Sequence, residues 1–384
     1  MNRLILIGNG FDLAHGMKTS YKDFILSYLK HGFSVMLNQS YFEDDLIKIY
    51  SNPSGFKEHR KIHDLQNWEI TDFSTLLINH DPFISNIDTR PSPWDLSKYV
   101  IHDKSDLIRL LITNCSDYRW VDIENEYYSM LCNLSAKNEH EKIKKLNLHF
   151  EYIQYLLANY LEKIEHNYLH NDSEYFRKGP LVEQLSQIFK GSYKDIEILG
   201  KNHPGIFPQR LLILNFNYTE TITDYIKELK NNFKEIKVIN IHGKLKDENN
   251  PMIFGYGDED ETNFSLLEKF DDCLHFVKTY RYTRTHNYQD FLDFIKSDQF
   301  DVFVLGHSCG LSDKTLLSEV FNNDNCYKIR LLTYNKNESQ TINIDSTDYV
   351  SKTYQIGRIF KNKAAMREKL IPFTPADVIR VERT

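Results

Sequence analysis

The chain has 384 residues, a formal net charge of -7 and 41% hydrophobic residues, which is enough apolar material for one large or two medium domains. The mild acidity argues against a surface that binds nucleic acid by charge alone. The five cysteines show no C-x-x-C spacing, so we expect neither a disulfide framework nor a structural zinc site. No apolar run suits a signal peptide or a membrane span, so we expect a cytoplasmic protein without a membrane segment.

The opening of the chain carries the most specific pattern. Residues 3–7 form a short apolar run, typical of a buried central strand. The run ends in Gly8, Asn9, Gly10, Phe11 and Asp12. Two glycines around one residue allow a sharp turn and leave no Cβ between the backbone N–H groups and a bound phosphate. With a helix expected over residues 21–29, capped by Thr19 or Ser20, this predicts half of a nucleotide-binding unit.

This opening is not a full dinucleotide-binding fingerprint. Leu13 stands where the third glycine would fall, and no second strand ending in an acidic residue follows about 20 residues on. A simple tight turn therefore explains the glycines equally well until other segments are considered.

The rest of the chain indicates an α/β fold with a large insertion. Residues 33–103 are irregular, whereas apolar residues recur at threes and fours over residues 141–168, as an amphipathic helix requires. Later apolar runs predict strands that alternate with helices: residues 211–214, 236–241, 252–254, 301–305 and 329–334. We expect a parallel-sheet, Rossmann-like core from residues 1–34 and 206–345, and a mostly helical insertion from residues 35–205. Residues 346–384 are a C-terminal segment of uncertain placement, with a helical pattern at 361–370.

Small and hydrogen-bonding residues follow four of these strands. The first strand is followed by the glycine turn. Asn217 and Thr219 follow the strand at 211–214, His242 follows the strand at 236–241, and Gly306, His307 and Ser308 follow the strand at 301–305. Ligands of open α/β sheets bind at the carboxyl ends of the strands. Four such ends at one edge favour a functional site over four unrelated turns.

Three of these residues are candidates for catalysis. Asn217 can hold a water or hydroxyl in one orientation, and His242 can act as a general base near neutral pH. Asp12 can bind a sugar hydroxyl or position a water. The structural alternatives are an asparagine that supports its own turn, a satisfied buried histidine and a carboxylate that caps the next turn.

The remaining candidates have supporting roles. His15 and His307 are weaker than His242. Ser312 and Asp313 predict an N-cap for the helix after Leu311, whose N-terminus would then favour a phosphate.

Other catalytic classes fail on spacing or order. His59 and His63 lack the H-E-x-x-H pattern and a clear third ligand, and the chain has no P-loop motif. Residues 306–310 match G-x-S-x-G, but a serine hydrolase needs a histidine downstream and none follows His307.

Four motifs resemble the bacteriophage abortive infection AbiH family in order. They are residues 4–16 with Thr19-Ser20-Tyr21, residues 216–219, residues 241–245, and residues 305–308 with Asp313. The likeness spans nearly the whole chain, and the same motifs resemble a remote sirtuin-like NAD-binding fold. Asn9 replaces a small residue of that pattern, Thr219 replaces an Asp, and the sirtuin zinc module is missing, which disfavours protein deacetylation.

The resemblance implies an antiviral NAD glycohydrolase-like enzyme without a metal. Asn217, His242 and Asp12 would be catalytic, and the nucleotide would be bound by Gly8, Asn9, Gly10, Phe11, His15, Thr219, Gly306, His307, Ser308 and Asp313. NAD would be substrate or ligand, a phage-derived component would be the trigger, and a homo-oligomer is left open. Two alternatives stand: a non-catalytic sensor of ADP-ribose or NAD, and a nuclease using Asp122, Glu124 and Glu126.

Overall fold

The computed structural model describes residues 1–51, 65–70, 73, 99–115, 120–170, 180–190, 208–257, 264–335 and 342–379. The chain divides into two compact units. The first, here the core unit, comprises Met1–Lys18, Leu161–Glu261 and Phe276–Thr384; the second unit comprises Thr19–Tyr160 and Thr262–His275.

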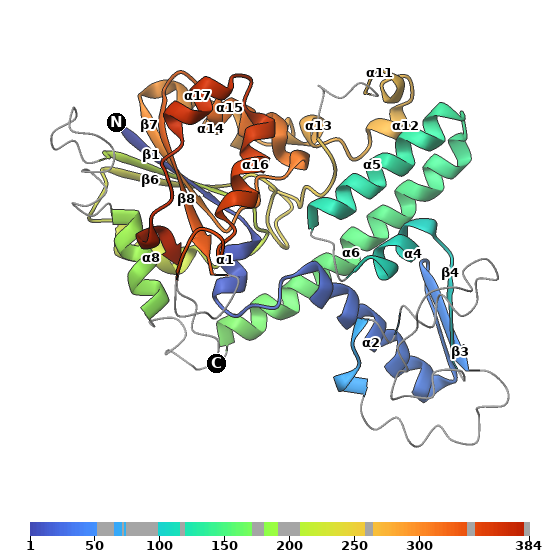
Figure 1. The fold of residues 1–384 in the computed structure, drawn as a ribbon. Coiled ribbons are helices and arrows are strands. Elements are labelled where there is room, and N and C mark those ends of the chain that lie inside the picture. The colour runs from blue at the N-terminus through green and yellow to red at the C-terminus, as the bar shows by residue number, and fades with distance from the viewer. Residues whose placement is uncertain are drawn as a thin grey trace. The chain divides into compact units, whose positions relative to one another are not determined.

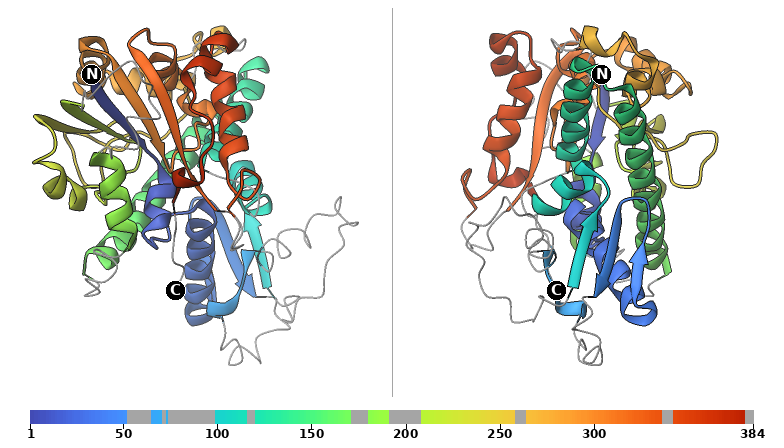
Figure 2. Two further views of the ribbon diagram at one scale, coloured as in Figure 1. Left: turned by 60° about the vertical axis from the view of Figure 1, so that its left-hand side comes forward. Right: turned by 90° about the vertical axis from the view of Figure 1, so that its right-hand side faces the viewer.

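The core unit contains a six-stranded parallel sheet. Its strands are β1 (Asn2–Ile7), β5 (Arg210–Asn215), β6 (Glu235–Asn240), β7 (Phe300–Leu305), β8 (Cys326–Tyr334) and β9 (Val378–Ile379). The spatial order is β6-β5-β1-β7-β8-β9, so the blue strand β1 lies between the yellow-green and the orange strands (Figures 1 and 2). Numbered in chain order this is 3-2-1-4-5-6, the doubly wound Rossmann order, and the predicted α/β fold class is confirmed.

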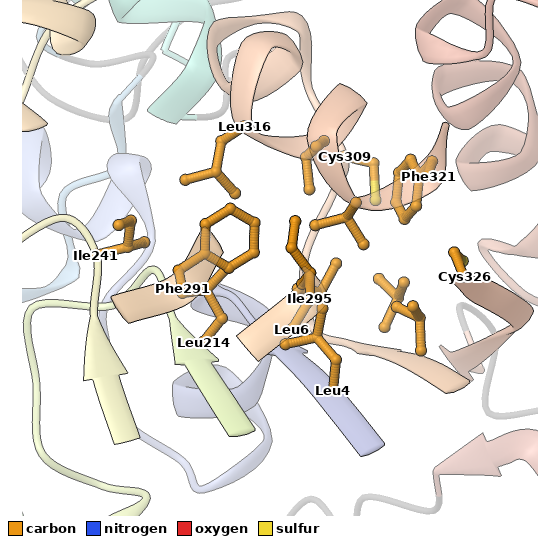
Figure 3. Close-up of a cluster of buried hydrophobic side chains, with 14 of the residues drawn as sticks. Leu4, Leu6, Leu214, Ile241, Phe291, Ile295, Cys309, Leu316, Phe321 and Cys326 are labelled. Atoms are coloured by element: carbon orange, nitrogen blue, oxygen red, sulfur yellow. The ribbon is translucent and has the colours of Figure 1, made fainter. Parts of the chain in front are cut away.

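Helices cover both faces of this sheet, because alternate strand residues point to opposite sides. Leu4 and Leu6 face one apolar cluster, whereas Ile5 and Ile7 face the other. The first cluster is completed by α14 (Asn287–Ser297), α15 (Lys314–Phe321) and α16 (Tyr349–Ile359). Figure 3 shows Leu4, Leu6 and Leu214 of the sheet in this cluster with Phe291, Ile295, Leu316 and Phe321. The second cluster is completed by α8 (Pro180–Lys190) and α10 (Thr223–Leu229).

Shorter elements connect these layers. They are α1 (Asn9–Ala14), α13 (Lys278–Tyr282), α17 (Lys363–Lys369), and the 3-10 turns η4 (Leu311–Asp313) and η5 (Pro375–Asp377). Helix α1 begins directly after β1, so the predicted glycine turn is a single residue, Gly8, between a strand and a helix.

The second unit joins helices to a small antiparallel sheet. Its elements are α2 (Tyr21–Gln39), β2 (Tyr41–Glu43), β3 (Ile47–Ser51), η2 (Leu65–Asn67), β4 (Tyr99–Asp103), α4 (Asp106–Thr113), α5 (Trp120–Ala136), α11 (Phe264–Leu267) and α12 (Asp271–Leu274). The long helix α6 (His140–His170) runs from this unit into the core unit. Ser20 caps α2, as predicted, by accepting a hydrogen bond from the Asp23 N–H at 3.1 Å.

Two predictions of local structure are wrong. Residues 252–254 form no strand. The Ile253 N–H donates to the carbonyl of His242, and the segment forms no β-ladder with a described strand. The region 33–103 is not simply irregular, since α2 continues to Gln39 and β2, β3 and β4 form a sheet. Across the described residues, no helix combines the length and apolar character needed to cross a membrane.

Candidate functional site

The strands that were expected to share an edge do so. Ile7 at the end of β1 lies opposite Asn215 of β5 and Leu305 of β7, and Asn215 lies opposite Asn240 of β6. Because these strands are parallel and end at one level, the loops that follow them leave the same edge of the sheet. This edge includes the point between β1 and β7 where the doubly wound order reverses, the usual ligand position in such sheets.

The glycines at this edge serve close packing of two loops. The N–H groups of Gly8 and Gly10 donate to the carbonyls of Leu305 (3.1 Å) and Gly306 (2.9 Å), and the Phe11 N–H donates to Gly8 (2.8 Å). A Cβ on Gly8 or Gly10 would lie 2.7 or 2.8 Å from the Cα of His307 or Gly306. The N–H groups of Gly8 and Gly10 therefore hold the two loops together, and that of Phe11 closes the turn into α1, so none of these three N–H groups is left for the phosphate expected here.

Asp12 and Thr219 form the first polar group of the site. The Asp12 side chain is 2% exposed, and its Oδ2 accepts a hydrogen bond from the Thr219 hydroxyl at 2.6 Å. Its other oxygen, Oδ1, is buried and has no hydrogen-bond partner among the described residues. Burial raises the pKa of Asp12 to about 6, although the Thr219 hydroxyl and, more weakly, the nearby polar groups of Thr221 and Asn217 oppose this rise. The group can therefore exchange a proton close to neutral pH.

The amide of Asn217 is fixed beside this carboxyl group. Its Nδ2 donates to the Gly8 carbonyl at 3.1 Å, and its backbone N–H donates to Asn215 Oδ1 at 3.1 Å. Asn215 is itself held by Asn240, whose Oδ1 accepts from Asn215 Nδ2 at 2.8 Å. The orientation of Asn217 is therefore set by the ends of β1, β5 and β6.

A second polar group surrounds the carboxylate of Asp313. Its Oδ1 accepts from Lys278 Nζ at 2.8 Å and lies 3.2 Å from Nε2 of His242, while its Oδ2 lies 3.5 Å from Nε2 of His307. The Tyr282 hydroxyl is also 3.2 Å from His242 Nε2. Asp313 thus gathers donors from α13 and from the loops after β6 and β7.

Burial and neighbouring charges shift the pKa values of Asp313 and His242. Burial would raise the pKa of Asp313, but the Lys278 charge and the bond to His242 hold it well below its usual value. Burial and the Lys278 charge lower the pKa of His242, against the opposing effect of Asp313. The imidazole of His242 is therefore neutral at physiological pH and can accept a proton.

Phe216 connects the two polar groups. Its ring centroid lies 5.1 Å from the His242 ring and 4.1 Å from the His307 ring. His307 in turn packs against Gly8, whose carbonyl holds Asn217. Asp12, Asn217, His242 and His307 are therefore brought to one edge of one sheet, as the sequence predicted.

Two candidates have roles other than those expected. His15 donates from Nδ1 to the Phe11 carbonyl (2.7 Å) and accepts at Nε2 from the Tyr225 hydroxyl (2.6 Å), so neither ring nitrogen is left for a ligand. Asp313 stands at the N-cap position of α15, as predicted, but its side chain makes no cap hydrogen bond, because it faces Lys278 and the histidines instead. The predicted position is therefore confirmed, whereas the carboxylate has a different role from capping.

The loop after β7 also speaks against a serine nucleophile. Its residues with positive φ are Gly306 (68°) and Cys309 (54°), whereas Ser308 has none of this strain. The nucleophile of a G-x-S-x-G elbow sits on the strained turn itself. Ser308 is half-buried in the loop after β7.

Sequence reasoning missed Lys278 and Tyr282. Both come from α13, a five-residue helix with no strong periodic pattern. A signal was present, since Lys278 follows the apolar residues Phe276 and Val277 directly and lysine in such surroundings needs a partner. The side chain of Asp122, one nuclease candidate, lies outside the described residues, and among those described no cluster of His, Cys, Asp and Glu could hold a metal ion.

A known protein family matches most of the chain. The model of the family described as bacteriophage abortive infection AbiH matches residues 4–335. No curated protein matches the chain. The family match includes β1 at one end and β8 at the other, and it contains Asp12, Asn217, His242 and Asp313. Because it covers most of the chain and every strand end that forms the site, the chain belongs to the bacteriophage abortive infection AbiH family and has a role in phage defence.

Proposed function

We propose that this chain acts in abortive infection by hydrolysing the nicotinamide–ribose bond of NAD or of a close nucleotide relative. The observation that supports the proposal is the meeting of Asp12, Asn217 and His242 at the carboxyl edge of a doubly wound sheet. Nucleotides bind at this edge in sheets of that order. A phage-derived component would trigger the reaction.

The reaction requires little covalent chemistry from the protein. A water attacks C1′ of the ribose, the bond to nicotinamide breaks, and ADP-ribose, nicotinamide and one proton are formed. The transition state resembles an oxocarbenium ion, so oriented dipoles and a nearby carboxylate lower its energy. Positioning water and ribose hydroxyls contributes further.

Each residue has a role that matches its surroundings. Asn217, with its amide fixed by Gly8, orients the water or a ribose hydroxyl. Asp12, whose Oδ1 accepts no hydrogen bond from any described residue, binds a sugar hydroxyl or stabilises positive charge at C1′. His242, neutral in its buried position, takes up the proton of the water.

The experiment measures nucleotides by mass spectrometry after incubation of NAD with purified protein, with and without a phage lysate. We expect ADP-ribose and nicotinamide to accumulate with the wild type. His242→Ala and Asn217→Ala should each lose about 10²–10⁴-fold in rate, the usual contribution of a general base or an oriented polar group.

Control substitutions distinguish loss of activity at the site from a general effect of the substitutions on the folded protein. His102 and Asn38 are exposed residues of the second unit, so His102→Ala and Asn38→Ala should cleave NAD at the wild-type rate. NAD left intact with the lysate present would refute the enzyme. Tight NAD binding by calorimetry without product would instead indicate a nucleotide sensor.

A further inference from the structure

Lys278 is buried beside the proposed base and binds the same carboxylate as that base. Its side chain is 2% exposed, and its Nζ donates to Asp313 Oδ1 at 2.8 Å and to the Ser312 carbonyl at 3.4 Å. A lysine in such a position needs an anionic partner, because an isolated buried charge is costly. One such partner, the Asp313 carboxylate, is shared with His242 and His307.

The ion pair is a poor candidate for a purely stabilising role. A buried pair often adds no more stability than apolar residues of similar size would. Asp313 also does more than neutralise Lys278, since its Oδ1 is within 3.2 Å of His242 Nε2 and its Oδ2 is 3.5 Å from His307 Nε2. The charge of Lys278 keeps the Asp313 carboxyl ionised, so it can only accept hydrogen bonds.

An ionised Asp313 decides where both imidazoles carry their protons. His307 Nδ1 accepts from the Cys309 N–H at 2.9 Å, so the proton of this ring is on Nε2, facing Asp313. The same carboxylate favours a proton on Nε2 of His242. No described residue hydrogen-bonds Nδ1 of His242. A protonated Asp313 would itself donate to Nε2 and would move the proton of His242 to Nδ1.

We propose that Lys278 and Asp313 are positioning residues that hold His242 as the Nε2–H tautomer and so leave its Nδ1 as the free proton acceptor of the site. Four groups from three segments face this ring: Lys278 and Tyr282 of α13, Asp313 before α15, and His307 after β7. The arrangement is a carboxylate-oriented base, in which the carboxylate is in turn set by a buried lysine.

The test reads the tautomer directly by imidazole ¹⁵N NMR over a pH series of the whole protein without nucleotide. The His242 signals are assigned by their loss in His242→Gln. We expect the wild-type ring to show a protonated Nε2 and an unprotonated Nδ1 at neutral pH. In Lys278→Met the midpoint of His242 protonation should rise by roughly one pH unit, because a nearby positive charge is gone. Lys278→Arg should keep the wild-type tautomer and midpoint.

A matched lysine controls for loss of a buried charge. Lys352 is also buried, at 5% exposed, with Nζ donating to the Leu332 carbonyl at 2.8 Å and paired with Asp348, and neither partner is a histidine. Lys352→Met should leave the His242 titration unchanged. An Nδ1–H tautomer in the wild type would overturn the proposal even if Lys278→Met does not fold, as would an unmoved midpoint in a folded Lys278→Met.

An activity measurement extends the test and rests on the proposed function. The acid limb of the pH profile for NAD cleavage should move upward in Lys278→Met in step with the NMR midpoint. If no NAD is cleaved, the proposed reaction fails while the NMR result stands. If NAD is cleaved but the limb does not move with the midpoint, His242 is not positioned by this pair for that reaction.

Discussion

At the scale of single residues, the buried carboxyl of Asp12 lowers the stability of the folded protein. Its carboxyl is buried, one of its oxygens has no hydrogen-bond partner in the described part of the chain, and its pKa is raised to about 6 mainly by desolvation. Unpaired buried polar atoms are rare because they lose their hydrogen bonds to water. A protein that keeps such a group beside Asn217 and Thr219 sacrifices stability at this position, as functional sites often do.

Replacing Asp12 by Asn should therefore stabilise the protein at neutral pH. The folded pKa lies above the ordinary 3.8, so the folded state holds its proton more tightly and loses stability as pH rises from about 4 through 6. This difference corresponds to up to about 3 kcal/mol at pH 7, and to little at pH 4. Urea unfolding of wild type and Asp12→Asn at both pH values measures it.

The same substitution should abolish the proposed NAD cleavage, since an amide cannot carry the negative charge. Asp271→Asn, at an exposed position of the second unit, serves as the control and should change neither stability nor turnover. An Asp12→Asn protein that is less stable than wild type at pH 7, or equally shifted at both pH values, would contradict the assignment of a strained carboxyl.

At the scale of elements, the site depends on how the loops after β1 and β7 meet. Gly306 has φ 68°, and a Cβ on it would lie 2.2 Å from the Phe11 backbone nitrogen. The contact also contains the hydrogen bond from Gly10 N–H to the Gly306 carbonyl. The position of Asp12 in α1 relative to His307 is therefore set by backbone contact, which side-chain repacking cannot replace.

Gly306→Ala should cost far more than the same change at Gly16. Both glycines have positive φ, 68° and 76°, so alanine is strained by about 1–2 kcal/mol at either position. A Cβ at Gly16 meets nothing within 4 Å, whereas at Gly306 it would overlap backbone. We expect Gly16→Ala to lose only the conformational cost in urea unfolding and Gly306→Ala to lose at least twice as much. Equal losses would show that the loop contact is not tight.

Local sequence patterns predict the strands of the sheet, but they do not predict the partners of the polar side chains. The apolar runs of β1, β5 and β7 predicted buried strands because both faces of a parallel sheet are covered. Residues 252–254 carry a similar run yet form no ladder, since a run of three also suits buried loop. Asp313 looked like a cap, because its true donor Lys278 lies 35 residues away and no local rule reports such a contact.

At the scale of the whole chain, the core unit is closed by its first strand. β1 pairs with β5 on one side and β7 on the other, although these begin at residues 210 and 300. The central strand is the first in the sequence, but both strands that pair with it come about 200 or more residues later, so the fold depends on contacts of long sequence separation. Such pairings are slow to form because the loop entropy is lost before the contacts are made. The register of β1 then determines whether Gly8 and Asp12 reach the site.

A buried ion pair at the amino ends of these strands fixes that register. Arg3 of β1 lies opposite Asp301 of β7, 298 residues later, with Nε–Oδ1 at 3.1 Å and Nη2–Oδ2 at 2.8 Å. The guanidinium also donates to the Phe189 carbonyl at 3.3 Å and lies 4.4 Å from the centroid of the Phe303 ring. Both side chains are almost fully buried, so neither is left solvated if its partner is removed.

A double-mutant cycle on this pair should show strong coupling. Arg3→Met leaves Asp301 as an uncompensated buried charge and should cost about 3–5 kcal/mol in urea unfolding, whereas Arg3→Met with Asp301→Leu should recover most of that loss. The control is Arg210–Glu235, a cross-strand pair of the same chemistry on β5 and β6 that is 37% and 51% exposed. There Arg210→Met should cost no more than about 1 kcal/mol. If the double variant at Arg3 and Asp301 is no more stable than Arg3→Met alone, the pair contributes through packing, and the register of β1 is set by its apolar residues instead.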